Sequence, residues 1–66
     1  MRYFLNKHTI LSGHAKGFWF ITPQGKCLFS HVNGFIEDSL SNEHALTNEY
    51  VLIERQALLK LLQSND

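Results

Sequence analysis

The stretch KGFWFITPQGKCLFSHV, residues 16–32, decides what kind of fold this chain adopts. Lys16 to Ile21 is dense in aromatic and β-branched residues, and Lys26 to Val32 continues an extended pattern. The turn formers Thr22-Pro23-Gln24-Gly25 lie between them. Two such runs joined by a turn that contains proline and glycine predict a β-hairpin.

A register for this hairpin follows if Thr22 lies opposite Gly25. Side chains alternate between the two faces of a strand, so the pairing sorts them. One face then carries Lys16, Phe18, Phe20, Cys27, Phe29 and His31. The other carries Trp19, Ile21, Leu28, Ser30 and Val32. The second face is the more aliphatic, so we expect it to be buried and the first to stay open to solvent.

The N-terminal segment favours one more strand. It runs from Tyr3 to Leu11, is centred on residues 9–11, and ends near Ser12-Gly13. Asn33-Gly34 is typical of a turn after the hairpin.

The C-terminal third predicts mixed structure. Residues 39–48 are polar and predict irregular structure, with one helical turn around Glu43 to Leu46. Tyr50 to Ile53 predicts a short strand that runs into a helix over Glu54 to Gln63. Apolar residues of this segment fall on one helical stripe, namely Ile53, Ala57, Leu58, Leu61 and Leu62.

The composition is that of one small folded domain over residues 1–66. Apolar residues make up 44% and charged residues 18%, which argues against intrinsic disorder. Cys27 is the only cysteine, so we expect neither a disulfide nor a zinc finger. The longest apolar run, Phe18 to Ile21, is far below the roughly 20 residues that span a bilayer. We expect no metal, cofactor or membrane partner, and no catalytic residue, because Cys27 has no evident orienting group.

Positive charge and aromatic rings are concentrated in the same half of the chain. Residues 1–31 carry four basic residues and no acid, a formal charge of +4. Residues 32–66 carry six acids and two bases, a formal charge of −4. Six of the eight aromatic residues also lie in the basic half, as a polyanion with stackable bases requires. Mutual attraction of the two halves on folding is the other explanation of the charge pattern.

Two motifs in the hairpin resemble those of a known family. Ala15 to Pro23, followed by Gly25 and Leu28 to Val32, is similar to the two ribonucleoprotein motifs of the cold-shock domain, an OB-fold that binds single-stranded nucleic acid. The resemblance covers roughly residues 9–35. It implies a nucleic-acid-binding set in which rings stack on bases beside a phosphate-facing cation. That set is Lys16, Phe18, Phe20, Phe29 and His31.

The chain departs from the family pattern at two places in the motif region, and after Val32 it has no match to the family's last two strands. Trp19 stands where the family has a glycine between the two phenylalanines of the first motif. The family's first-strand Lys-Trp-Phe-Asn run falls at residues 10–13, which contain neither the cation nor the rings.

We therefore expect a mainly β fold, a small OB-like or cold-shock-like antiparallel sheet or partly open barrel with a C-terminal helix. The alternative is an α+β fold, a three-stranded antiparallel sheet with a packed helix.

The expected function is binding of single-stranded DNA or RNA with low sequence specificity, in a cytoplasmic regulator of gene expression or nucleic-acid chaperone that is not an enzyme. The alternative is a small protein-protein interaction module or regulator of phage or plasmid type, homodimeric or bound to another protein, without nucleic-acid binding. The leucines of residues 58–62 close the core in the simpler case and form a dimer seam in the other.

Overall fold

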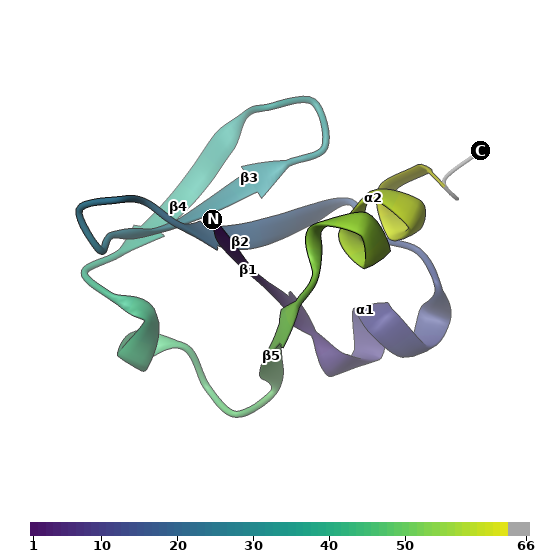
Figure 1. Ribbon diagram of the computed structural model, residues 1–66, viewed down its shortest axis with the longest axis horizontal. Coiled ribbons are helices and arrows are strands. Elements are labelled where there is room, and N and C mark those ends of the chain that lie inside the picture. The colour runs from purple at the N-terminus through teal and green to yellow at the C-terminus, as the bar shows by residue number, and fades with distance from the viewer. Residues whose placement is uncertain (64–66) are drawn as a thin grey trace.

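The computed structural model describes residues 1–63 and contains one five-stranded antiparallel sheet followed by a C-terminal helix (Figure 1). The strands are β1 (Arg2–Asn6), β2 (Gly17–Ile21), β3 (Cys27–His31), β4 (Ile36–Leu40) and β5 (Tyr50–Ile53). The helical elements are α1 (Lys7–Ser12), the 3-10 turn η1 (Glu43–Ala45) and α2 (Arg55–Gln63). The expected mainly β fold with a C-terminal helix is confirmed. The sheet has five strands rather than the three of the alternative.

The strand order is β4-β3-β2-β1-β5. The first four strands form a meander, and β5 returns to pair with the outer side of β1. Within residues 1–63 the sheet is open, because β4 and β5 lie at its two ends. The connection that contains η1 therefore has to pass from one edge of the sheet to the other, as Figure 1 shows.

The N-terminal segment corrects the expectation of a strand centred on residues 9–11. β1 ends at Asn6, and that stretch lies in α1. The side chain of Asn6 accepts a hydrogen bond of 2.8 Å from the backbone N–H of His8, which caps the helix N-terminus. Gly13 ends the helix with a φ of 75°. These two helix signals outweigh the strand preference of the β-branched residues between them.

The β2–β3 hairpin forms, but its register differs by one residue from the predicted one. Trp19 lies opposite Phe29. The loop has three residues, because Thr22 donates its N–H to the carbonyl of Lys26 at 2.8 Å, and Gly25 takes a φ of 91°. A shift of one residue moves every side chain of β3 to the opposite face of the sheet.

The observed register defines two faces. The helix face carries Tyr3, Leu5, Phe18, Phe20, Leu28, Ser30, Val51 and Ile53. The ring face carries Phe4, Asn6, Gly17, Trp19, Ile21, Cys27, Phe29, His31, Tyr50 and Leu52. The predicted nucleic-acid platform is therefore divided, with Phe18 and Phe20 on one face and Phe29 and His31 on the other. The prediction that these four share one face is wrong.

Helix α2 packs on the helix face and closes the core there. The buried cluster consists of Leu5, Ala15 and Leu58, and its partly buried border includes Tyr3, Ile10, Phe18, Ile53, Leu61 and Leu62. Leu58 is 2% exposed, whereas Leu59 is 40% exposed. The expectation that this helix closes the core is confirmed for Leu58, Leu61 and Leu62, whereas Ala57 of the expected stripe is exposed.

The C-terminal half agrees with the sequence except at β4. The helical turn, the strand Tyr50–Ile53 and the terminal helix lie where they are expected. The prediction of irregular structure from residue 39 is wrong, because residues 39 and 40 end β4. Most of β4 is exposed, and its centre is Glu37-Asp38-Ser39. This segment therefore lacks the alternation of apolar and polar residues that would predict a strand.

None of the helices formed by residues 1–63 is long and apolar enough to cross a membrane.

Replacing Leu58 with alanine should lower the free energy of unfolding by about 2–4 kcal/mol, because it leaves a cavity under α2. Leu59→Ala, one position along the same helix, should cost less than about 1 kcal/mol, because that side chain is already partly in water. Urea denaturation followed by circular dichroism measures both values. Equal losses in the two variants would contradict the packing of α2 through Leu58.

Candidate functional site

The ring face carries a continuous row of ring side chains, which we call the ring row. In spatial order it consists of Tyr50, Trp19, Phe29, His31 and Phe35. Successive ring centroids are 6.4, 5.3, 5.3 and 5.8 Å apart. These distances are typical of edge-to-face and tilted aromatic pairs. The row thus links β5, β2, β3 and the turn before β4 in one chain of contacts.

The rings of the row differ in how much of their surface is exposed. Trp19 is only 8% exposed and is the most buried ring of the row. Phe29, His31 and Tyr50 are half-buried, while Phe35 is 63% exposed. The row therefore contains one buried ring with more exposed rings on either side of it.

Gly17 leaves the space that the ring of Phe29 occupies. A Cβ atom at Gly17 would lie 2.8 Å from the ring carbon Cζ of Phe29 and 2.7 Å from the backbone oxygen of Ser30. Both distances are shorter than real contacts, so only glycine fits without a shift of the neighbouring groups. The Lys-Gly pair of the sequence motif thus places a cation beside a bare backbone on which Phe29 lies.

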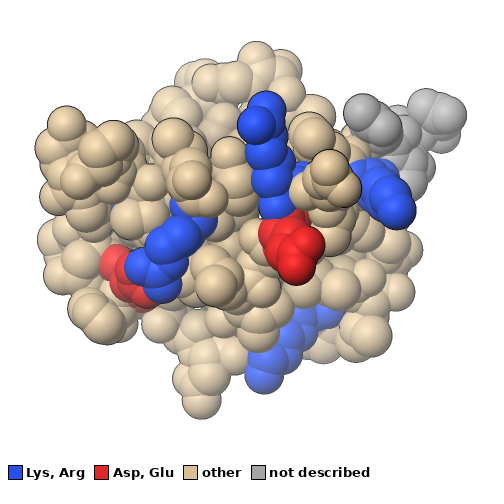
Figure 2. All heavy atoms as spheres, viewed as in Figure 1, with Lys and Arg blue, Asp and Glu red and all other residues tan. Residues whose placement is uncertain are grey.

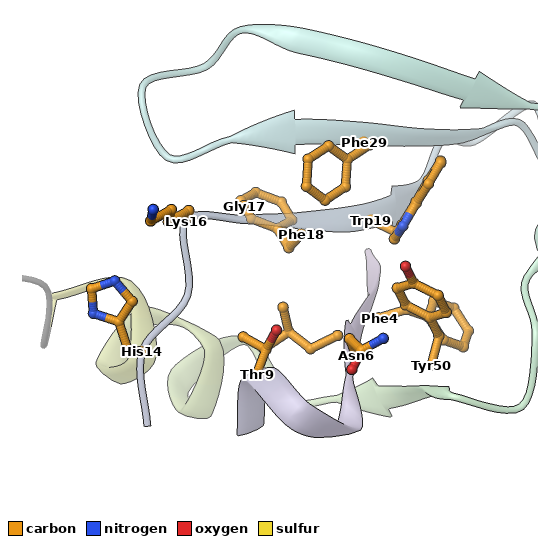
Figure 3. Close-up of a pocket in the computed structure, with 11 residues that line it drawn as sticks. Phe4, Asn6, Thr9, His14, Lys16, Gly17, Phe18, Trp19, Phe29 and Tyr50 are labelled. Atoms are coloured by element: carbon orange, nitrogen blue, oxygen red, sulfur yellow. The ribbon is translucent and has the colours of Figure 1, made fainter. Parts of the chain in front are cut away.

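A hollow of about 410 Å³ opens beside the row, between β1, β2 and α1. Rings form one part of its lining, namely Phe4, Phe18, Trp19, Phe29 and Tyr50, and polar side chains form another, namely Asn6, Thr9, His14 and Lys16. Figure 3 shows these polar groups along the lower and outer margins and the rings above and at one side. The volume falls within the range of roughly 300–1,000 Å³ that is usual for ligand pockets.

The side of the row that faces β4 is acidic. A second hollow of about 350 Å³ is bordered by Glu37 and Asp38 together with Trp19, Phe29, Tyr50 and His31. Asp38 lies opposite Phe29, but Ile36 lies opposite Ser30, so Glu37 is an extra residue in β4. This bulge turns the carboxylate of Glu37 to His31, whose Nε2 it contacts. The row consequently has two acids on its β4 side, and Lys16 lies near the same His31 end, because its backbone oxygen accepts a 2.8 Å hydrogen bond from the N–H of Val32.

Strand β1 carries one cation, Arg2, and two aromatic residues, Tyr3 and Phe4, which sequence reasoning did not assign to the site. β1 begins Arg2-Tyr3-Phe4, so the first strand does not fall at residues 10–13. The guanidinium of Arg2 lies 5.7 Å from the ring centroid of Phe4, close enough for a cation–π contact. It also pairs with both carboxylate oxygens of Glu43. Arg2 is therefore already neutralised, and Phe4 is the residue of this strand that joins the rings of the ring face.

The predicted site residues are thus only partly brought together. Phe29 and His31 lie in the ring row, and exposed Lys16 borders the adjacent hollow. Phe18 borders the core and also lines this hollow, whereas Phe20 lies on the other face and does not line it. Residues that sequence reasoning did not assign to the site are Phe4, Trp19, Phe35 and Tyr50. Gly25 is the sequence signal that would have placed Trp19 in the site. A glycine at the end of a three-residue loop sets the register of the hairpin, and the register decides which side chains of β3 lie beside Trp19.

Basic and acidic side chains are interspersed on the face of the molecule shown in Figure 2. Figure 2 shows basic and acidic side chains scattered singly or in pairs over the visible face, which is mostly uncharged. The pair Arg2–Glu43 joins the basic half of the sequence to the acidic half. Attraction between the halves thus accounts for part of the charge pattern.

Cys27 lies on the ring face and is fully buried. Burial, and to a lesser extent the carboxylate of Glu43, raises the pKa of its thiol above the usual value. Within residues 1–63 no group of three or more His, Cys, Asp or Glu side chains is arranged to hold a metal ion.

Comparisons of the chain with protein-family models, with curated proteins and with solved structures found no significant match.

Gly17→Ala should lower the free energy of unfolding by about 1–3 kcal/mol, because its methyl group meets Phe29 and the backbone of Ser30. In a Phe29→Ala background the same substitution should cost less, because one of the two obstacles is gone. A double-mutant cycle measured by urea denaturation gives the difference. If the cost is the same in both backgrounds, the ring of Phe29 does not rest on Gly17.

Stability should fall in alkaline solution partly because of Cys27. The unfolded chain loses the thiol proton near the ordinary pKa of 9.0, whereas the folded chain retains it. The unfolded state therefore binds fewer protons, and the free energy of unfolding decreases as pH rises above about 8. Urea midpoints measured between about pH 7 and 10 under reducing conditions should fall more steeply for the wild type than for Cys27→Ala. Parallel curves would contradict the raised thiol pKa.

Proposed function

We propose that the protein binds short stretches of single-stranded DNA or RNA across the ring row. It would act with low sequence specificity as a regulator of gene expression or a nucleic-acid chaperone in the cytoplasm. The observation that carries this proposal is the row itself, in which half-exposed rings follow one another across the sheet around buried Trp19. No catalytic step is part of the proposal.

Stacking supplies most of the binding free energy in this proposal. A base on an aromatic ring contributes roughly 1–3 kcal/mol, and any base can take part because each has a π-face. Phe29 and Tyr50 flank Trp19 and are half-buried, so their rings are held in place yet accessible. Two or three stacked bases would give useful affinity without recognition of a long sequence.

Electrostatic attraction makes a small contribution in this proposal. Lys16 is the exposed cation at the row, since Arg2 is paired with Glu43. Each phosphate neutralised on a single strand lowers the slope of log affinity against log salt by about 0.7. With one or two such contacts, we expect a slope of about −1.

A second candidate is binding of an extended peptide, and the acidic β4 side of the row favours it. Glu37 and Asp38 border the hollow beside Phe29, and their negative charge would repel the phosphates of a nucleic acid there. A peptide with a basic residue beside these carboxylates and apolar side chains on the rings of the row matches this surface. This candidate corresponds to a protein-interaction module, with another protein or a second copy of the chain as its partner.

Fluorescence anisotropy of a labelled oligothymidine of about eight nucleotides tests the first proposal at low salt. Phe29→Ala should weaken binding by about 5- to 100-fold, the loss of one stacked base. The matched control is Phe20→Ala, which removes the same ring from a half-buried position on the helix face and should change affinity less than about twofold. Circular dichroism establishes that both variants are folded.

Absence of binding by the folded wild type at low salt would refute the nucleic-acid proposal. Equal losses in Phe29→Ala and Phe20→Ala would refute the ring row as the binding surface. Size-exclusion mass and binding to a mixed-charge peptide then test the interaction-module candidate.

A further inference from the structure

The outer edge of β5 carries backbone groups that point away from the sheet. β5 is the last strand on its side, and β1 is its strand neighbour within residues 1–63. In an antiparallel pair, residues whose backbone groups bond the neighbouring strand alternate with residues whose groups point away from it. The carbonyl of Glu49 accepts the N–H of Lys7 at 2.8 Å, which fixes the phase of this alternation. Val51 therefore bonds to β1, whereas Tyr50 and Leu52 direct their backbone groups to the outer edge.

This edge lacks the features that disturb pairing at β4. β5 pairs with β1 in a regular register, whereas β4 contains the bulge at Glu37. The strand Tyr50–Ile53 has no charged residue. Leu52 lies within it on the ring face, and its side chain is 58% exposed. An uncharged, regular edge with an exposed apolar side chain favours addition of a strand from another molecule.

One register of pairing between two copies uses the available backbone groups best. It places Leu52 opposite Leu52 of the second copy on a two-fold axis, so that each residue donates its N–H to the other's carbonyl. A shift that pairs Tyr50 with Leu52 needs the N–H of Tyr50, which already bonds the carbonyl of Thr47 at 3.1 Å. The opposite shift pairs Leu52 with Glu54, whose carbonyl already accepts the N–H of Leu58 at 2.9 Å.

The same register brings opposite charges together at both ends of the pairing. Glu49 precedes β5 by one residue, and Arg55 follows it by two. With Leu52 on the axis, each Glu49 lies near Arg55 of the other copy. Both side chains are exposed, and within residues 1–63 neither has an ion-pair partner. Glu54 lies opposite the uncharged Tyr50 of the other copy, so this register sets no acid directly against another acid.

We propose that the β5 edge binds a second copy of this chain and forms a two-fold dimer. Each copy contributes its five strands to one continuous sheet. The two Leu52 side chains meet on the ring face, so both ring faces lie on the same side of the dimer. Because only a few residues pair, the dimer is weak, with a dissociation constant on the order of 100 µM.

The dimer also places two ring rows on one surface. Each row ends at Tyr50, and the two Tyr50 positions are offset by four residues along the strands, about 13 Å. A nucleic-acid strand that leaves one row therefore reaches the other. This consequence rests on the proposed function, whereas the dimer itself does not.

Sedimentation equilibrium from about 10 µM to 1 mM tests the dimer in the absence of nucleic acid. The average mass should rise from that of one chain toward that of two. Glu49→Arg and Arg55→Glu each put like charges at both ends of the pairing and should weaken association at least about fivefold. The double variant restores opposite charges and should return to within about twofold of the wild type.

A matched control separates this contact from a general effect of charge. Lys60→Glu makes the same charge reversal further along α2, on an exposed residue, and should change association less than about twofold. Leu52→Pro removes the outward N–H but leaves the pairing with β1 intact, so it should abolish the dimer without unfolding the chain. Circular dichroism establishes that all variants are folded.

The outcomes distinguish this inference from the proposed function. A wild type that stays monomeric up to about 1 mM refutes the dimer, and oligothymidine binding by that monomer leaves the function standing. A dimer that the single charge variants do not weaken, or that the double variant does not restore, refutes the β5 edge as the interface. A dimer that forms as expected but binds no oligothymidine supports this inference and refutes the function.

Discussion

The three-residue loop between Thr22 and Lys26 is the constraint on which the arrangement of this surface depends. Gly25 takes a φ of 91° there, which a side chain would make costly. The loop sets whether β3 meets β2 in one register or in the register shifted by one residue. Since side chains alternate along a strand, that single choice decides that Phe29 and His31 join Trp19 rather than Phe18 and Phe20.

The elements of the fold could largely be predicted from the sequence, but the composition of the candidate site could not. The hairpin, the strand Tyr50–Ile53 and the leucine-rich helix follow from local patterns of apolar residues. Tyr50 lies on the ring face because β5 pairs with β1, and no local sequence pattern predicts this long-range pairing. Helix α1 was missed because its capping interaction from Asn6 outweighed the strand preference of Thr9 and Ile10.

Two small groups connect the folding of the sheet to the shape of the candidate site. Gly17 has no side chain, and this leaves room for the ring of Phe29. Asn6 ends β1 and begins α1, and its amide also borders the hollow. The same residues that interrupt or end regular structure thus shape the surface on which a ligand would lie.

The exposed outer strand β4 affects how the molecule behaves at high concentration. Its free edge lies beside the exposed apolar side chains of Phe35 and Ile36, a combination that favours addition of a strand from another molecule. Glu37 and Asp38 place negative charge in the middle of this strand, and the bulge at Glu37 interrupts its regular pairing. An approaching identical edge would bring the same two carboxylates with it. The acids that limit attraction of a polyanion therefore also oppose edge-to-edge pairing of β4 with β4 of a second copy.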